Sequence, residues 1–313
     1  MSPMRAVSAP ENFVFIRAQL GLCQNKDAQY RVNDMIKILE QGAWLNYTNR
    51  LNEEELISQA MFLSTRYDCS ATICATKKDS KLTQAYYSIH RCPDMSKRGE
   101  TTIPELVGLE RSDGIKAIKY LKDFGDDGKV KELLLECIRG LIQADTYLFD
   151  VFGFKTRKEY QIQWQEDRPN YCRAYWNELP PIDEWPIYIG ADEHHRTENY
   201  YTKYKSYVIL QKNETEVMIS GTYNDSFHEM HGELTYDPVS RNINFFDVMV
   251  CRAPHALCYE LSDTAAEFFV GKPIDNFSKR EVGKILGGAP GCFHIVDVVY
   301  DMTSAAIELK NAK

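Results

Sequence analysis

The apolar positions near the start of the chain recur at helical spacing. Val32, Met35 and Leu39 lie three or four residues apart, which predicts a helix over residues 27–44. Residues 1–12 show no such period and contain two prolines, so they are expected to form a disordered tail. The first ordered element is therefore predicted to be helical.

The same helical signal continues through the first half. Asn52 is followed by three glutamates, which is typical of a helix N-terminus because the amide caps the helix and acidic groups stabilise its positive end. A helix is predicted over residues 52–67, and further helices over 114–124 and 129–149. We therefore expect a mainly helical domain over residues 13–163.

One β-hairpin interrupts this helical half. Residues 69–76 and 82–90 are rich in β-branched and aromatic side chains, and the polar residues 77–80 between them are suited to a turn.

A segment rich in tryptophan and proline follows, over residues 164–200. Trp164, Trp176 and Trp185 lie here among several prolines, which makes the segment too apolar for a flexible linker. We expect a connecting arm that packs across the body of the protein.

After residue 200 the pattern becomes typical of strands joined by short turns. Such short connections predict an antiparallel meander, since parallel neighbours need long crossovers. Strands are predicted over residues 203–210, 216–222, 228–236 and 242–250, and helices over 256–270, 278–286 and 292–309. The expected fold class is α+β: a helical N-terminal half with a short hairpin, then a C-terminal antiparallel β-meander covered by helices over residues 201–313.

Composition narrows the classes of protein. The 313 residues are 44% hydrophobic and 26% charged, as in globular proteins, and their net charge is −8. An acidic chain gives no electrostatic reason to bind nucleic acid. Neither a long apolar run nor an N-terminal signal pattern is visible, so no membrane partner and a cytoplasmic location are expected. A small-molecule substrate is the expected partner, and homo-oligomer formation stays open.

The nine cysteines show no metal-binding pattern. None are paired at CxxC spacing, so reduced, buried thiols are expected rather than a zinc site or a disulfide framework. No nucleotide, flavin or metal motif is visible, and we expect neither a cofactor nor a metal.

The strongest local motif is the glycine-rich segment GGAPGCFH at residues 287–294, which opens the last predicted helix. Free amide groups at a helix start attract anions, and a thiol there is expected to have a depressed pKa. Gly288 and Gly291 could therefore bind a substrate oxyanion or carboxylate beside Cys292 or His294. The alternative is a tight turn that lets the helix pack on the sheet.

Two histidines are candidates for acid–base chemistry. In the last helix, Asp297 follows His294 by one turn and could orient its imidazole, although it could equally be an acidic residue stabilised by the helix dipole. In the third predicted strand, His228 falls on the apolar face, where it needs a hydrogen-bond partner; Asp225 is the candidate. A satisfied core histidine is the alternative at this position.

Two tyrosines near this strand are also candidates. Tyr223 and Tyr236 are expected to bind the substrate, although a tyrosine-rich core would explain them equally well.

Residues 204–307 resemble a bacterial family with a domain of unknown function whose members end in a GG-x-x-GC-T-HL loop. The corresponding loop here reads GGAPGCFHI, and the family's H-x-M strand matches His228-Glu229-Met230. Phe293 replaces the family's threonine, which removes a hydroxyl beside Cys292 and His294. The resemblance implies a domain boundary and a site location, and it implies no particular reaction.

The first functional hypothesis is a cofactor-independent lyase or isomerase acting on a small apolar or aromatic molecule. His228 and His294 would be the general acid and base, Asp297 or Asp225 would orient them, and the amides of the glycine loop would hold a developing anion. One alternative is a non-catalytic small-molecule-binding or assembly protein, in which the loop and the histidines serve packing. A further alternative is thiol-dependent acyl transfer or hydrolysis at Cys292.

Overall fold

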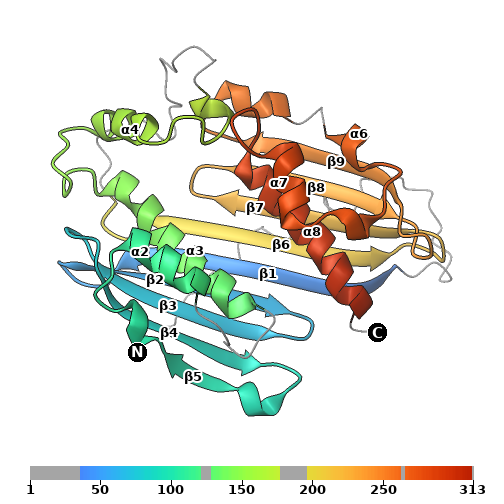
Figure 1. Cartoon of the computed structure of the whole chain (residues 1–313), viewed down its shortest axis with the longest axis horizontal. Helices are drawn as coiled ribbons and strands as arrows, with labels where there is room; N and C mark the ends of the chain where they lie inside the picture. The colour runs from blue at the N-terminus through green and yellow to red at the C-terminus, as the bar shows by residue number, and fades with distance from the viewer. Residues whose placement is uncertain (1–35, 121–127, 177–195, 262–264, 312–313) are drawn as a thin grey trace, which may run out of the picture. The chain divides into compact units, whose positions relative to one another are not determined.

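A single nine-stranded antiparallel sheet forms the body of the protein (Figure 1). The computed structural model describes residues 36–120, 128–176, 196–261 and 265–311, all within one compact unit, Ile36–Lys313. The strand order is β5-β4-β3-β2-β1-β6-β7-β8-β9. The strands are β1 (Lys37–Arg50), β2 (Glu55–Ser64), β3 (Asp68–Thr76), β4 (Leu82–Arg91), β5 (Gly99–Thr102), β6 (Tyr201–Gln211), β7 (Val217–Asp225), β8 (Glu229–Tyr236) and β9 (Ile243–Arg252).

Two meanders, each followed by helices, build this sheet. The first strands of the two meanders, β1 and β6, pair antiparallel at the centre. The α-helices are α2 (Arg111–Tyr120), α3 (Lys129–Ala144), α4 (Arg157–Glu166), α6 (Ala266–Phe269), α7 (Lys279–Leu286) and α8 (Phe293–Asn311). The 3₁₀ turns are η1 (Met95–Lys97), η2 (Pro104–Leu106), η3 (Asp145–Tyr147), η4 (Arg173–Tyr175), η5 (Ala256–Leu261) and η6 (Ile274–Asn276). Helix α3 packs on β1 to β3, and α8 packs on β6 to β8, across the same face of the sheet (Figure 1).

The prediction of a helical N-terminal half is wrong. Residues 37–50 and 55–64 are the strands β1 and β2, where helices were expected over 27–44 and 52–67. Residues 27–35 of the first predicted helix, and the predicted tail at 1–12, lie outside the described residues. The side chain of Asn52 accepts hydrogen bonds from the backbone N–H groups of Glu54 and Glu55, both at 2.8 Å. It therefore caps the turn between two strands rather than a helix.

Other parts of the prediction are confirmed. The expected hairpin is the antiparallel pair β3–β4, and the expected C-terminal meander is β6 to β9. The α+β content is also as predicted. The expected boundary near residue 200 falls inside the continuous sheet, because β1 and β6 pair along most of their length.

Close packing fixes the position of α8 over the second meander. Gly221 and Gly232 lie opposite each other on β7 and β8, and a Cβ atom at either position would lie 2.7 Å from the side chain of Met302. Glycine at both positions leaves room for the Met302 side chain between the helix and the sheet. The start of α8 lies next to the β7–β8 turn, where the rings of His294 and His228 are 3.9 Å apart.

Helices long and apolar enough to cross a membrane are absent from the described part of the chain.

Candidate functional site

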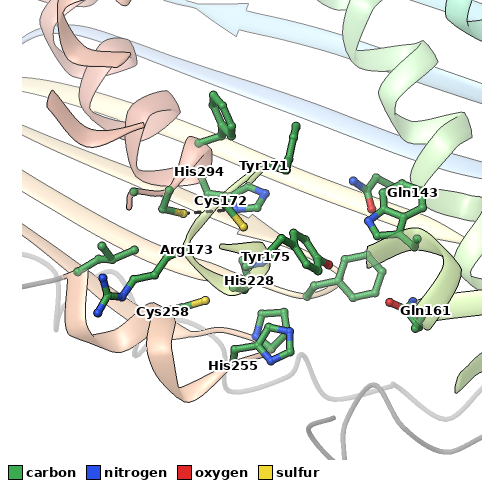
Figure 2. Close-up of a pocket in the computed structure, with 18 of the residues that line it drawn as sticks. Gln143, Gln161, Tyr171, Cys172, Arg173, Tyr175, His228, His255, Cys258 and His294 are labelled. Carbon is green, nitrogen blue, oxygen red and sulfur yellow. Dashed lines mark hydrogen bonds between the residues drawn. The ribbon is translucent and has the colours of Figure 1, made fainter. Parts of the chain in front are cut away.

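A small cavity of about 110 Å³ lies where the β7–β8 turn meets the start of α8 (Figure 2). Its walls come from the C-terminal end of α3, from α4, from the segment around η4, from η5 and from the first residues of α8. The site therefore combines residues from both halves of the chain. An engineered apolar cavity of about 150 Å³ can hold benzene, so this one is suited to a small ligand.

Asp225 organises the β7–β8 turn at the edge of the cavity. Its Oδ1 accepts hydrogen bonds from the backbone N–H groups of Phe227 and His228, both at 2.7 Å, and lies 3.1 Å from His228 Nδ1. Its Oδ2 accepts hydrogen bonds from the hydroxyls of Tyr223, at 2.8 Å, and Tyr201, at 3.3 Å. This buried carboxylate fixes the orientation of the His228 imidazole. Asp225 is therefore the partner of His228, as predicted.

The same contacts keep Asp225 ionised. Burial by itself would raise its pKa, but the charge and hydrogen bond of His228, with the nearby His294 and the Phe227 amide, hold the pKa of Asp225 well below its usual range. A permanent negative charge therefore lies behind His228, on the side away from the cavity.

His294 lies against His228 at the start of α8. The ring centroids are 3.9 Å apart, and the ring of Tyr223 is 5.0 Å from that of His294. Burial, together with the neighbouring His228, lowers the pKa of His294 to about 3. The imidazole of His294 is therefore neutral at pH 7, beside an imidazole that is paired with a carboxylate.

Cys292 also borders the cavity, but its chemistry differs from the expectation. Its Sγ lies 3.6 Å from His294 Nδ1. Burial raises the pKa of this thiol to about 12, although the backbone N–H groups of Ile295 and His294 act in the opposite direction. The depressed pKa expected at this helix start is therefore wrong, because burial outweighs the helix N-terminus.

The raised pKa of Cys292 predicts that its thiol reacts slowly in the folded protein. Alkylation of Cys292 by iodoacetamide at pH 7.5 should be slower than that of the exposed Cys251 by about 10²-fold or more. Mass spectrometry of peptides after timed alkylation measures both rates. Faster labelling of Cys292 than of Cys251 would restore the thiol hypothesis.

The glycine-rich loop makes a tight turn that seats α8. The Gly291 amide donates to the Gly288 carbonyl at 3.0 Å, and the Cys292 amide donates to the Leu286 carbonyl at 2.7 Å. A Cβ atom on Gly291 would lie 2.1 Å from the Leu286 oxygen, and Gly288 has a φ of +76°. Gly291 borders the cavity, whereas Gly288 does not. The amides of Gly291 and Cys292 are already occupied, which favours the packing interpretation of the loop.

Two more of the predicted site residues, Asp297 and Tyr236, lie away from the cavity. The carboxylate of Asp297 faces Lys279, at 3.2 Å, and Lys203, at 3.8 Å, rather than either imidazole. Tyr236 lies at the other end of β8, with the guanidinium of Arg241 5.4 Å from its ring. Of the two tyrosines, only Tyr223 is next to the histidines.

The sequence analysis did not single out the residues of the opposite wall. Gln143 comes from α3, Gln161 and Trp164 from α4, and Tyr175 from η4 (Figure 2). Part of this wall belongs to the start of the predicted tryptophan-rich arm. The backbone N–H of Arg173, in this arm, donates to the Gly291 carbonyl of the glycine loop at 2.9 Å. Aromatic composition indicated that this segment packs, but it carried no signal for what it packs against. Trp185 lies outside the described residues.

Three residues of the site could also hold a metal ion. Asp225, His228 and His294 offer ligand atoms that all lie within 4.8 Å of one another. Two imidazoles and one carboxylate form a donor set used for first-row divalent metals. Both oxygens of Asp225, however, already accept hydrogen bonds from backbone or tyrosine donors. The expectation of no metal stays a prediction.

A buried charged network lies beside this site, between α3, α8 and β6. Lys203 Nζ lies 2.8 Å from Glu136 and 4.8 Å from the centre of the Tyr223 ring. Burial by itself would raise the pKa of Glu136, but the charges of Lys203 and Arg139 lower it to about 2. The network therefore reaches the site through Tyr223, whose hydroxyl donates to Asp225.

The depressed pKa of Glu136 predicts acid sensitivity. Its unfolded value is near 4.5, so Glu136 contributes stability that is present above pH 4.5 and lost as the pH falls towards 2, in total about 3 kcal/mol. Urea unfolding at a series of pH values measures the free energy of unfolding. Between pH 4.5 and 2 this free energy should fall less steeply in Glu136→Gln than in the unmodified protein. The exposed-pair variant Glu216→Gln should keep the slope of the unmodified protein, and equal slopes for all three proteins would contradict the prediction.

Comparison with known families agrees with the resemblance predicted for the C-terminal third. A family model described as "Protein of unknown function (DUF2889)" matches residues 208–308. This region contains His228, Cys292 and His294, but not the walls contributed by α3, α4 and η4. Neither the curated proteins nor the solved structures contain a match to the chain.

Proposed function

We propose that this protein is an enzyme that performs acid–base chemistry on a small apolar or aromatic molecule, with His228 as the proton-transferring group. The observation that carries the proposal is the buried Asp225–His228 pair at the edge of the cavity. Nδ1 of His228 faces the carboxylate, and Nε2 has no hydrogen-bond partner among the described residues. An imidazole whose Nδ1 is oriented by a carboxylate can act through Nε2 as a general acid or base.

The proposed proton transfer follows from the charges of the site. His228 Nε2 accepts a proton from the substrate, and the carboxylate of Asp225 stabilises the imidazolium that forms. The neutral His294 can stabilise negative charge developing on a substrate oxygen. Return of the proton to a different atom gives an isomerase, and its transfer to a leaving group gives a lyase.

Deuterium exchange tests this proposal without knowledge of the natural substrate. The probe is 2-indanone, a planar neutral ketone whose hydrogens next to the carbonyl exchange when a base removes them. Proton NMR in D₂O follows the loss of their signal. The protein is expected to accelerate the exchange above the buffer rate, and Cys292→Ser is expected to exchange at nearly the same rate.

The controls separate three mechanisms. Loss of exchange in Cys292→Ser would favour the thiol, and loss of exchange with excess EDTA would favour a metal held by the histidines. A rate equal to that of buffer would contradict the enzyme proposal and favour the non-catalytic binding alternative.

A further inference from the structure

Two glutamine side chains border the cavity without hydrogen-bond partners among the described residues. Gln161, on α4, is only 8% exposed, and Gln143, on the last turn of α3, is half-buried. Figure 2 shows both on the same side of the cavity, away from His294. The two amide groups are not sealed from the cavity, so each can donate to and accept from a polar group of a ligand there.

The walls between these amides and the histidines are mainly aromatic. Trp164, Tyr175 and Phe227 line the cavity, and Tyr175 lies between the glutamines and the histidines in Figure 2. Aromatic walls around a cavity of about 110 Å³ fit a flat molecule with about one ring inside the cavity.

Arg173 is the only arginine or lysine among the described residues that line the cavity. The guanidinium of Arg173 is paired with Glu260. Burial lowers the pKa of His255 to about 4, so this imidazole is neutral at pH 7.

We propose that the substrates are neutral, planar aromatic molecules with a carbonyl, amide or hydroxyl group that hydrogen-bonds Gln161 and Gln143. This inference rests on the proposed function, because it assigns the substrate class of the same cavity. The two amides determine which end of the molecule faces His228, and the reacting atom lies at the opposite end from the group that they bind.

Three probes of matched shape test the substrate class: benzamide, benzoate and isopropylbenzene. Dissociation constants from ligand-observed NMR are expected to be lowest for benzamide and at least 10-fold higher for benzoate. Gln161→Leu should weaken benzamide binding about 10-fold and leave isopropylbenzene binding unchanged. Gln163→Leu is the matched control, because Gln163 lies on the same helix, exposed, and donates to Asp167 at 2.9 Å.

The outcomes distinguish this inference from the enzyme proposal. Benzoate binding as tight as benzamide binding, or an unchanged benzamide affinity in Gln161→Leu, would overturn the substrate class. If exchange into 2-indanone persists in that case, the proposed function stands. If the probes bind as expected but no exchange occurs, the cavity selects neutral aromatic ligands and the acid–base proposal fails.

Discussion

Replacing His228 with asparagine is expected to slow deuterium exchange into 2-indanone by about 10²–10⁴-fold. Asparagine keeps a nitrogen donor near Asp225, so the turn and the buried carboxylate keep their hydrogen bonds. It has no group that accepts a proton near pH 7. The loss should therefore fall on the rate of exchange rather than on folding, which the thermal unfolding midpoint checks.

His231→Asn is the matched control for this variant. His231 lies on β8 only three residues further along, at a half-exposed position that does not border the cavity. Its exchange rate should equal that of the unmodified protein. Equal rates for both histidine variants would show that the exchange does not depend on the Asp225–His228 pair.

Replacing Lys205 with methionine is expected to lower the free energy of unfolding by about 3–5 kcal/mol. Lys205 is 2% exposed, and its Nζ lies 2.9 Å from Asp301 and 3.3 Å from Glu132. Methionine keeps most of the volume over the Trp44 ring but leaves two carboxylates of the network without this cation. Urea unfolding followed by tryptophan fluorescence measures the change.

Two further variants define the origin of this effect. Lys212→Met removes an exposed pair with Glu216, so its cost should be below about 1 kcal/mol. Burial raises the pKa of Asp301 to about 6, so the loss in Lys205→Met should be smaller at pH 5, where this carboxyl is mostly protonated. A loss equal to that of Lys212→Met would mean that the buried network does not stabilise the fold.

The second half of the sheet was predictable because apolar and polar residues alternate clearly along its strands. On β8, Met230 and Leu234 are buried, and His231 and Glu233 between them are more exposed. Short polar turns mark both ends of each strand, so local patterns were sufficient to define the meander.

The first strands were not predictable in this way. Met61 and Leu63 on β2 are 37% and 46% exposed, so apolar residues occur on both faces of the strand. This blurs the period of two and resembles helical spacing. The cap at Asn52 is equally favourable before a helix and inside a strand turn, so only the pairing of β2 with β1 and β3 decided the structure.

In the candidate site, too, contacts between residues close in sequence were predictable and contacts between distant residues were not. His228 and Asp225 lie three residues apart, so their pairing follows from the local turn, and the sequence by itself indicated both. It also indicated His294 as a candidate, but not its ring contact with His228, because 66 residues separate the two positions. Asp297 was assigned to the wrong partners because its lysines come from β6 and α7.

The sequence by itself therefore determined the C-terminal meander, the local Asp225–His228 pair and the turn that begins α8, because each depends on neighbours within a few residues. Only the tertiary structure decided the continuous sheet, the neutral state of His294, the high pKa of Cys292 and the wall formed by Gln143 and Gln161. These features depend on burial and on contacts between segments far apart in the chain. Local periodicity in the sequence predicts neither of them.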